Sequence, residues 1–234
     1  MRASLRRTFL RQFDAMITYS NRGAGEYAAL GFPEKRIFVA PNAVAPRPER
    51  TVKTRPLQFT GRPSLLFVGR LQARKRVDLL LQACAAMPGD LRPELVIVGD
   101  GPERERLQSL AARVFPEARF LGAKQGRELV PYFSAADLFI LPGTGGLAVQ
   151  EAMSYGLPVI MGTGDGTNDD LVRVSNGWQV PPDDLETLTR VLRQALSDPA
   201  RLRSMGAASY RIVEQEVNVE RMVAVFVQAL DSLR

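Results

Sequence analysis

Six short apolar runs, each separated from the next by a stretch of helical periodicity, place the strongest constraint on how this 234-residue chain folds. The runs are nearly continuous in hydrophobicity, which is typical of strands covered on both faces. Strands that alternate with helices favour an open parallel sheet. We therefore predict an α/β fold with a Rossmann-like, doubly wound parallel sheet. The predicted strands are Leu65–Gly69, Glu94–Gly99, Ala118–Gly122, Asp137–Leu141, Pro158–Met161 and Gly177–Val180.

The stretches between these runs carry ordinary helix signals. A capping pattern, Asp183-x-x-Glu186, begins one helix, and Gly101-Pro102 begins another. One helix places its apolar residues on a single face, which makes its cysteine a core residue rather than a nucleophile. The members of that face are Val77, Leu80, Leu81, Cys84 and Met87.

Ligands of open parallel sheets bind beyond the carboxyl ends of the strands. Glycines stand at or just after four of these ends, namely Gly69, Gly99, Gly122 and Gly143. The chain therefore keeps side chains away from the edge where a ligand is expected.

The segment Ile140–Ile160 is the most informative part of this edge. Gly145 and Gly146 precede a helix that begins near Leu147, where backbone N–H groups can donate hydrogen bonds to phosphate oxygens. Glu151 follows about one turn later and suits a diol such as the 2′- and 3′-hydroxyls of ribose. An anion site beside a diol acceptor indicates a nucleotide.

A second cluster follows the first strand of the sheet, where four cationic side chains fall within seven residues: Arg70, Arg74, Lys75 and Arg76. A guanidinium can bind two phosphate oxygens at once, and an ammonium adds a point charge. Like charges crowded at a helix start are unfavourable by themselves, so a diphosphate ligand is favoured over a solvated surface.

These two segments resemble the donor-binding motifs of family 4 retaining glycosyltransferases with the GT-B fold. One family motif is Gly-Arg-Leu with a lysine five residues after the arginine, and Arg70 and Lys75 match it. The other has two glutamates separated by seven residues. Glu151 matches the second glutamate, whereas Gly143 stands in place of the first. The residues that follow the second glutamate match at Ala152, Met153, Gly156, Leu157, Pro158 and Val159.

The resemblance implies that a nucleoside-diphosphate sugar is the donor substrate, with no further cofactor and no metal. Arg70 and Lys75 are the implied catalytic residues, which hold the diphosphate and stabilise its charge as the sugar leaves. Glu151 is implied to bind the ribose. The missing glutamate means that nucleotide binding carries over better than sugar specificity. The other donor-binding candidates are Gly143, Gly145, Gly146, Leu147, Gly122 and Ala123, of which the last two are implied to contact the base through their backbone.

The resemblance also implies that the sheet is one half of a GT-B enzyme. Residues 1–45 are predicted to be a remnant of the N-terminal, acceptor-side domain, with strands at Met16–Ser20 and Arg36–Ala40 and a helix capped by Ser20. Residues 46–63 are a predicted linker, because they are rich in proline and lack periodicity. Residues 64–216 are the predicted nucleotide-sugar-binding domain, and 217–234 a C-terminal helix that crosses back onto the first domain.

Residues 1 to about 15 predict an amphipathic helix, with Leu5, Phe9 and Phe13 on one side and arginines on the other. An ordinary docked helix is the favoured interpretation, and peripheral contact with a membrane is the alternative.

Composition excludes several classes of function. The absence of histidine excludes a histidine general base, and a single cysteine makes a zinc site improbable. Lysine and arginine outnumber acidic residues, which gives a net charge of +6. No nucleic-acid motif accompanies this charge, so nucleic acid is not an expected partner. The lone cysteine and the lack of a signal peptide or membrane-spanning run predict a cytoplasmic protein, with a membrane face as the alternative.

The sequence therefore predicts the donor-binding domain of a retaining glycosyltransferase that acts on a glycan or a lipid-linked acceptor. The implied acceptor site belongs to the other GT-B domain. The chain is therefore expected to be a fragment, a reduced half-enzyme, or a chain that works with an acceptor-domain partner chain or by self-association. The leading alternative is a non-catalytic nucleotide-sugar-binding module that works with a partner subunit. A sugar-nucleotide epimerase is less favoured, because it would need a second domain and acid/base residues that are not visible in the sequence. A dinucleotide oxidoreductase is the least favoured, because the glycine fingerprint is incomplete.

Overall fold

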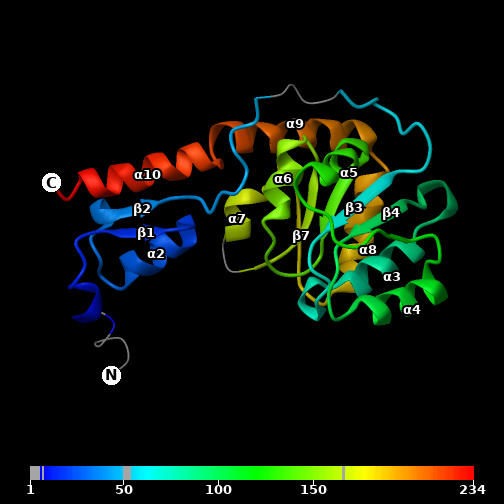
Figure 1. Cartoon of the computed structure of the whole chain (residues 1–234), viewed down its shortest axis with the longest axis horizontal. Helices are drawn as coiled ribbons and strands as arrows, with labels where there is room; N and C mark the ends of the chain where they lie inside the picture. The colour runs from blue at the N-terminus through cyan, green and yellow to red at the C-terminus, as the bar shows by residue number, and fades with distance from the viewer. Residues whose placement is uncertain (1–5, 7, 50–53, 165–166) are drawn as a thin grey trace.

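The predicted fold class is confirmed by a computed structural model, which describes residue 6 and residues 8–49, 54–164 and 167–234. Figure 1 shows an α/β unit beside a small N-terminal unit that the C-terminal helix crosses. The six strands of the larger sheet are all parallel, in the order β5-β4-β3-β6-β7-β8. Each predicted strand is present: β3 (Ser64–Val68), β4 (Glu94–Val98), β5 (Arg119–Phe120), β6 (Leu138–Leu141), β7 (Val159–Gly162) and β8 (Gly177–Val180).

The order of the strands places a ligand crevice at the centre of the sheet. In register, Leu65 of β3 lies between Leu95 of β4 and Leu138 of β6. The chain runs outward from β3 to β5 and then returns to β6, from which it proceeds the other way to β8. Open α/β sheets bind ligands where the strand order reverses in this way. The loops after β3 and β6 are therefore the first candidates for a site.

Helices cover both faces of the sheet. On one face α3 contacts α4 and α8, and on the other α6 packs against α9 (Figure 1). Cys84 of α3 is fully buried, and this burial raises the pKa of its thiol, as expected for a core residue. The elements are η2 (Ala73–Lys75), α3 (Val77–Ala85), η3 (Gly89–Leu91), α4 (Arg104–Val114), η4 (Gly126–Leu129), α5 (Val130–Ala135), α6 (Ala148–Ser154), α7 (Thr167–Leu171), α8 (Leu185–Leu196) and α9 (Pro199–Gln215), where η marks a 3-10 helix.

Two helix starts differ from the sequence analysis. The cap of α8 is Asp184, whose carboxylate accepts a hydrogen bond from the Thr187 N–H at 2.9 Å, and not Asp183. Asp183 instead has a positive φ of 66° and forms an ion pair with Arg76. The long helix α9 was not predicted, although Asp198 and Pro199 form an ordinary capped start.

The small N-terminal unit has the predicted order of elements. Its strands β1 (Met16–Thr18) and β2 (Ile37–Val39) pair in parallel. The Ser20 hydroxyl accepts a hydrogen bond from the Gly23 N–H at 3.1 Å, which confirms the predicted cap of α2 (Asn21–Ala29). The C-terminal helix α10 (Val219–Asp231) contacts both strands, as expected for a helix that crosses back. A short 3-10 helix, η1 (Glu34–Arg36), precedes β2.

The predicted helix over residues 1–15 is only partly matched. Residues 1–5 and 7 lie outside the described part of the chain, and residues 6 and 8–10 are helical. A turn then follows, so the helix ends well before residue 15. Phe9 and Phe13 remain 59% and 42% exposed, while Leu10 is buried. The favoured interpretation, a helix docked on the protein through its apolar side, is wrong for Phe9 and Phe13, because both side chains are exposed. No helix in the described part of the chain is both long and apolar enough to cross a membrane.

The described part of the predicted linker, residues 46–49 and 54–63, forms neither helix nor strand. Arg55 fixes this segment to the α/β unit. Its guanidinium donates hydrogen bonds to the backbone carbonyls of Phe133, Ala136 and Tyr155, at 2.9 to 3.1 Å. The segment is thus bound along its course rather than free.

Gln150 of α6 holds the segment that leads out of the N-terminal unit. Its side chain is 2% exposed, and its amide oxygen accepts the Val44 N–H at 2.8 Å while its amide nitrogen donates to the Asn42 carbonyl. One buried amide therefore satisfies two backbone groups that no helix or strand pairs.

Replacing Gln150 with alanine is expected to lower the free energy of unfolding by about 1–3 kcal/mol, since both backbone groups lose their partner. Urea unfolding followed by circular dichroism measures this loss. Gln108→Ala on the exposed side of α4 is the matched control and should change little. Equal stability of the two variants would contradict the assigned contacts.

Candidate functional site

Lys75 is the most strongly constrained cation at the carboxyl edge of the sheet. It ends η2, directly after the loop that follows β3, and only 5% of it is exposed. Its ammonium donates hydrogen bonds to the backbone carbonyls of Thr144, at 2.8 Å, and of Gly145. Burial, with a smaller contribution from Arg74, lowers the pKa of Lys75 to about 8. The Lys75 side chain is thus mostly charged at neutral pH and loses its proton at moderately alkaline pH.

Arg70 lies in a different environment. It is exposed and lines a hollow of about 420 Å³, together with Gly99, Asp100 and Ala123. No hydrogen bond or ion pair in the described part of the chain engages its guanidinium. The Gly99 N–H donates to the Gly122 carbonyl at 2.8 Å, so both predicted backbone candidates, Gly122 and Ala123, lie at or next to this hollow.

The other two cations of the cluster are engaged by the protein. Arg74 donates to the Thr144 carbonyl at 3.2 Å. Arg76 adopts a left-handed backbone conformation and forms ion pairs with Asp78 and Asp183. The interpretation of all four cations as diphosphate ligands is therefore wrong for Arg76, which instead joins η2 to the start of α8.

The loop between β6 and α6 contains the predicted phosphate-binding glycines. Gly145 and Gly146 have positive φ values of 62° and 156°, conformations that L residues rarely adopt. Leu147 is 48% exposed and caps the first turn of α6 without a side-chain hydrogen bond. Gly143 is buried against the turn that carries Lys75. Lys75, Gly143, Gly145 and Gly146 thus form one continuous cluster.

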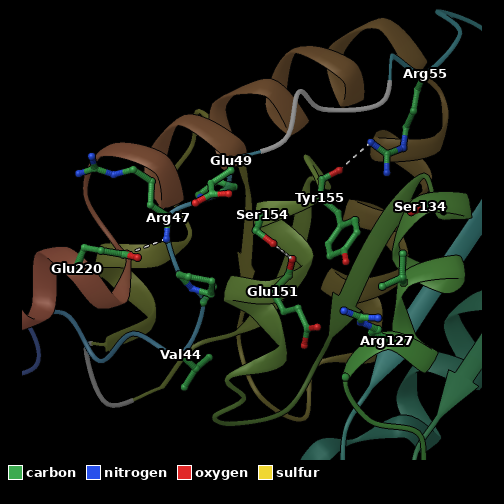
Figure 2. A pocket seen from close by; sticks show the side chains of 15 residues that line it. Val44, Arg47, Glu49, Arg55, Arg127, Ser134, Glu151, Ser154, Tyr155 and Glu220 are labelled. Carbon is green, nitrogen blue, oxygen red and sulfur yellow. Dashed lines mark hydrogen bonds between the residues drawn. The ribbon is translucent and has the colours of Figure 1, made fainter.

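Glu151 lines a separate pocket of about 890 Å³ (Figure 2). The side chain is half-buried, and desolvation raises the pKa of its carboxyl group. No hydrogen bond or ion pair in the described part of the chain engages that carboxylate. Figure 2 shows Arg127 on the facing side of the pocket. A half-buried carboxylate without a partner is an acceptor available to a ligand.

Four segments distant in sequence enclose this pocket. Arg47 and Glu49 come from the linker, Arg127 from η4 and Glu220 from α10. Tyr155 comes from the end of α6, where its ring stacks on Phe133 at 5.2 Å. The full lining is Val44, Ala45, Pro46, Arg47, Pro48, Glu49, Arg55, Gly126, Arg127, Val130, Ser134, Glu151, Ser154, Tyr155 and Glu220.

The predicted site residues therefore occupy three places. Lys75 and the glycines of the β6–α6 loop form the first, Arg70 and Ala123 line the second, and Glu151 lines the third. The predicted residues all follow the carboxyl ends of β3, β5 and β6. Arg70 and Glu151 do not share a pocket.

Sequence reasoning missed the residues that enclose Glu151, above all Arg127. One signal could have indicated it. Gln125 and Glu128 form a capping box at η4, directly after β5, so a charged turn at the ligand edge was readable from the sequence. In the described part of the chain, no group of three or more acidic or cysteine side chains could hold a metal ion.

Comparison with known proteins places these features in a family context. A family model described as glycosyl transferases group 1 matches residues 49–212. A GDP-mannose-dependent monoacylated alpha-(1-6)-phosphatidylinositol monomannoside mannosyltransferase from Corynebacterium glutamicum is 33% identical over 189 residues. That match covers 74% of this chain and 49% of the relative. The chain thus spans about half the length of this curated relative.

Solved structures agree with the fold. A sucrose-phosphate synthase from Thermosynechococcus elongatus is 25% identical with a TM-score of 0.76, and the match covers 99% of this chain and 61% of that one. The Anabaena protein HepE, solved in complex with UDP, is 20% identical with a TM-score of 0.73, over 97% of this chain and 67% of that one. The likeness to HepE concerns the fold alone.

Proposed function

Because the chain belongs to the glycosyl transferases group 1 family, we propose that it binds the nucleoside-diphosphate sugar donor of a retaining, metal-independent glycosyl transfer. The observation that carries this proposal is the Glu151 carboxylate, which is half-buried in a pocket of about 890 Å³ and has no partner among the described residues. A ribose diol offers two hydroxyl donors to one carboxylate, which would satisfy it.

Charge supports the placement of the diphosphate. Arg70 is an exposed guanidinium with no partner among the residues that the structure describes, and Lys75 is a buried ammonium whose ligands are carbonyls. Phosphate oxygens are stronger acceptors than carbonyls for a cation. On donor binding, Lys75 exchanges these carbonyls for phosphate oxygens. The β6–α6 loop, in which Gly145 has a positive φ, adjusts its conformation to allow this exchange.

The chemistry follows from the leaving group. When the bond between the sugar and the diphosphate breaks, negative charge develops on the diphosphate. Cations beside the diphosphate stabilise this charge, and so lower the barrier to transfer. Arg70 and Lys75 supply these cations, so no metal is needed for this role.

The relatives suggest what the donor and acceptor are. The Corynebacterium glutamicum relative is described as GDP-mannose-dependent and as acting on a phosphatidylinositol monomannoside. We therefore favour GDP-mannose as the first donor to test and a lipid-linked or glycan acceptor. The acceptor surface would come from a further GT-B domain, on the same polypeptide or on a partner chain, or from self-association. A cytoplasmic location, with contact at a membrane face, stays a prediction. The comparisons give no support to a non-catalytic module.

A thermal-shift series with GDP, UDP, ADP and their sugars tests donor binding. Ligand at 100 times its Kd should raise stability by about 2.7 kcal/mol. For a chain of this size that corresponds to an increase in Tm of roughly 5–10 °C. Arg70→Ala and Glu151→Ala should each strongly reduce the increase. A folded wild-type protein that no nucleotide stabilises would refute donor binding by this chain.

A further inference from the structure

Gly143 is the point at which two loops of the carboxyl edge touch backbone to backbone. A Cβ atom at this position would lie 2.0 Å from the Arg74 carbonyl oxygen and 2.5 Å from Lys75 Cα. Both are main-chain atoms, so no side-chain rotation can relieve the overlap. Only a residue without a side chain allows the η2 turn to approach β6 this closely.

The close approach fixes a set of polar contacts. The Thr144 N–H donates to the Arg74 carbonyl at 3.1 Å. In return the Lys75 ammonium donates to the Thr144 carbonyl at 2.8 Å and to the Gly145 carbonyl. The ammonium is therefore held by the residues that directly follow Gly143.

The end of the neighbouring strand reinforces this arrangement. A Cβ atom at Gly162, the last residue of β7, would lie 2.4 Å from the Pro142 carbonyl oxygen and 2.8 Å from that of Gly143. Gly143 is thus enclosed on one side by the η2 turn and on the other by β7. A Cβ atom at Gly143 would point at the η2 turn, while β7 packs against the Gly143 carbonyl from the other side, so the η2 turn would have to move.

We propose that Gly143 is a positioning residue, whose missing side chain lets the η2 turn seat the Lys75 ammonium against the carbonyls of Thr144 and Gly145. Resemblance to the family places a glutamate at this position. In this chain a glutamate would displace the turn that carries Lys75 rather than supply a contact to the sugar. The donor sugar is accordingly recognised without a carboxylate from this position.

Burial of the ammonium gives the arrangement a measurable signature. Lys75 has a pKa lowered to about 8 because desolvation disfavours its charged form. If the η2 turn moves away from β6, water reaches the ammonium and the pKa returns toward the ordinary value of about 10.4. This property reports on the position of Lys75 and not merely on global stability.

Competitive amine labelling across a pH series, read by mass spectrometry at Lys75, is the test. In the wild-type protein the labelling should titrate near 8, and in Gly143→Ala it should shift up by at least one unit. Gly61→Ala is the matched control, because a Cβ atom there meets nothing within 4 Å. Gly143→Ala should also lower Tm by roughly 5 °C or more, as expected for overpacking, while Gly61→Ala should not.

Several results would overturn the proposal. An ordinary titration of Lys75 in the wild-type protein would refute it even if Gly143→Ala fails to fold. An unchanged titration in Gly143→Ala, or a Gly143→Glu variant as stable as the wild type, would do the same. The proposal rests on the proposed function only for the assignment of Lys75 to the diphosphate. Every measurement is made without donor, so failure of donor binding leaves its outcome unaffected.

Discussion

Raising the pH from 7 to 9.5 is expected to weaken the binding of a nucleoside diphosphate about 30-fold, because Lys75 loses its proton in this interval. With a pKa of about 8, most Lys75 side chains are charged at pH 7 and few are charged at pH 9.5. The diphosphate itself is already fully ionised above pH 7, since its last pKa lies near 6. Isothermal titration calorimetry at a series of pH values measures the dependence.

Two variants separate Lys75 from other causes. Lys75→Gln should bind weakly at pH 7 and show almost no further loss up to pH 9.5. Arg70→Ala should bind weakly as well but keep the pH dependence, because its missing guanidinium does not titrate in this range. A pH dependence that persists in Lys75→Gln would show that another group is responsible.

Unfolding does not account for the expected loss. The pKa of Lys75 in the folded state lies below its value in the unfolded chain, so between about pH 8 and 10.4 the folded state binds fewer protons. The contribution of Lys75 to the free energy of unfolding therefore rises with pH through this window. Weaker binding together with an unchanged or higher stability assigns the effect to the site.

The strands of the sheet could be predicted because their signal is local. Each is a continuous apolar run, and β6 is buried along its whole length from Leu138 to Leu141. The cap at Ser20 was predictable for the same reason, since a hydroxyl and the N–H three residues later are neighbours in sequence. Local rules also apply to α9, which begins with an Asp198 cap followed by Pro199.

The state of the cations could not be read from the sequence, because it depends on residues far away in the chain. Arg76 pairs with Asp183, which belongs to the turn before α8. The Lys75 ammonium is buried against the carbonyls of residues that lie 69 and 70 positions further along the chain. Four cations within seven residues look equivalent in a sequence, whereas tertiary contacts give each a different neighbour.

The substitution at position 143 illustrates the same limit. In the sequence, Gly143 stands where the resemblance to the family implies a glutamate. In the structure it is a close contact between Arg74 and the end of β6, with a carbonyl oxygen 2.0 Å from where a Cβ atom would stand. The φ of Gly143 is not positive, so its backbone conformation does not require a glycine. The close approach of the Arg74 carbonyl requires it, and no local sequence pattern reveals this contact.

Replacing Glu151 with glutamine is expected to reduce donor affinity roughly 10- to 100-fold while leaving the folded chain at least as stable as the wild type. The loss follows from replacing a charged acceptor of ribose hydroxyls by an amide of the same shape, because hydrogen bonds to charged groups contribute about 1.5–3 kcal/mol. Calorimetric titration with the nucleotide selected by the thermal-shift series measures the affinity, and urea unfolding measures the stability.

The expected direction of the stability change follows from the raised pKa of Glu151. Its folded-state pKa lies above that of the unfolded chain, so the folded state binds more protons between the ordinary value of about 4.3 and the raised one. The contribution of Glu151 to stability therefore falls as pH rises through this window, and it stays reduced at pH 7. Glutamine removes the desolvated charge. Glu105→Gln on the exposed side of α4 is the matched control and should alter neither quantity.

The combination of weaker binding and undiminished stability distinguishes a ligand site from a structural carboxylate. A carboxylate that served the fold would accept hydrogen bonds from the protein, and its replacement by glutamine would destabilise the folded state. Glu151 accepts none in the described part of the chain, although it is half-buried beside Ser154 and Tyr155. A destabilised Glu151→Gln variant with unchanged nucleotide affinity would therefore reverse the assignment. It would place the ribose elsewhere along the carboxyl edge, with the hollow beside Arg70 as the next position to test.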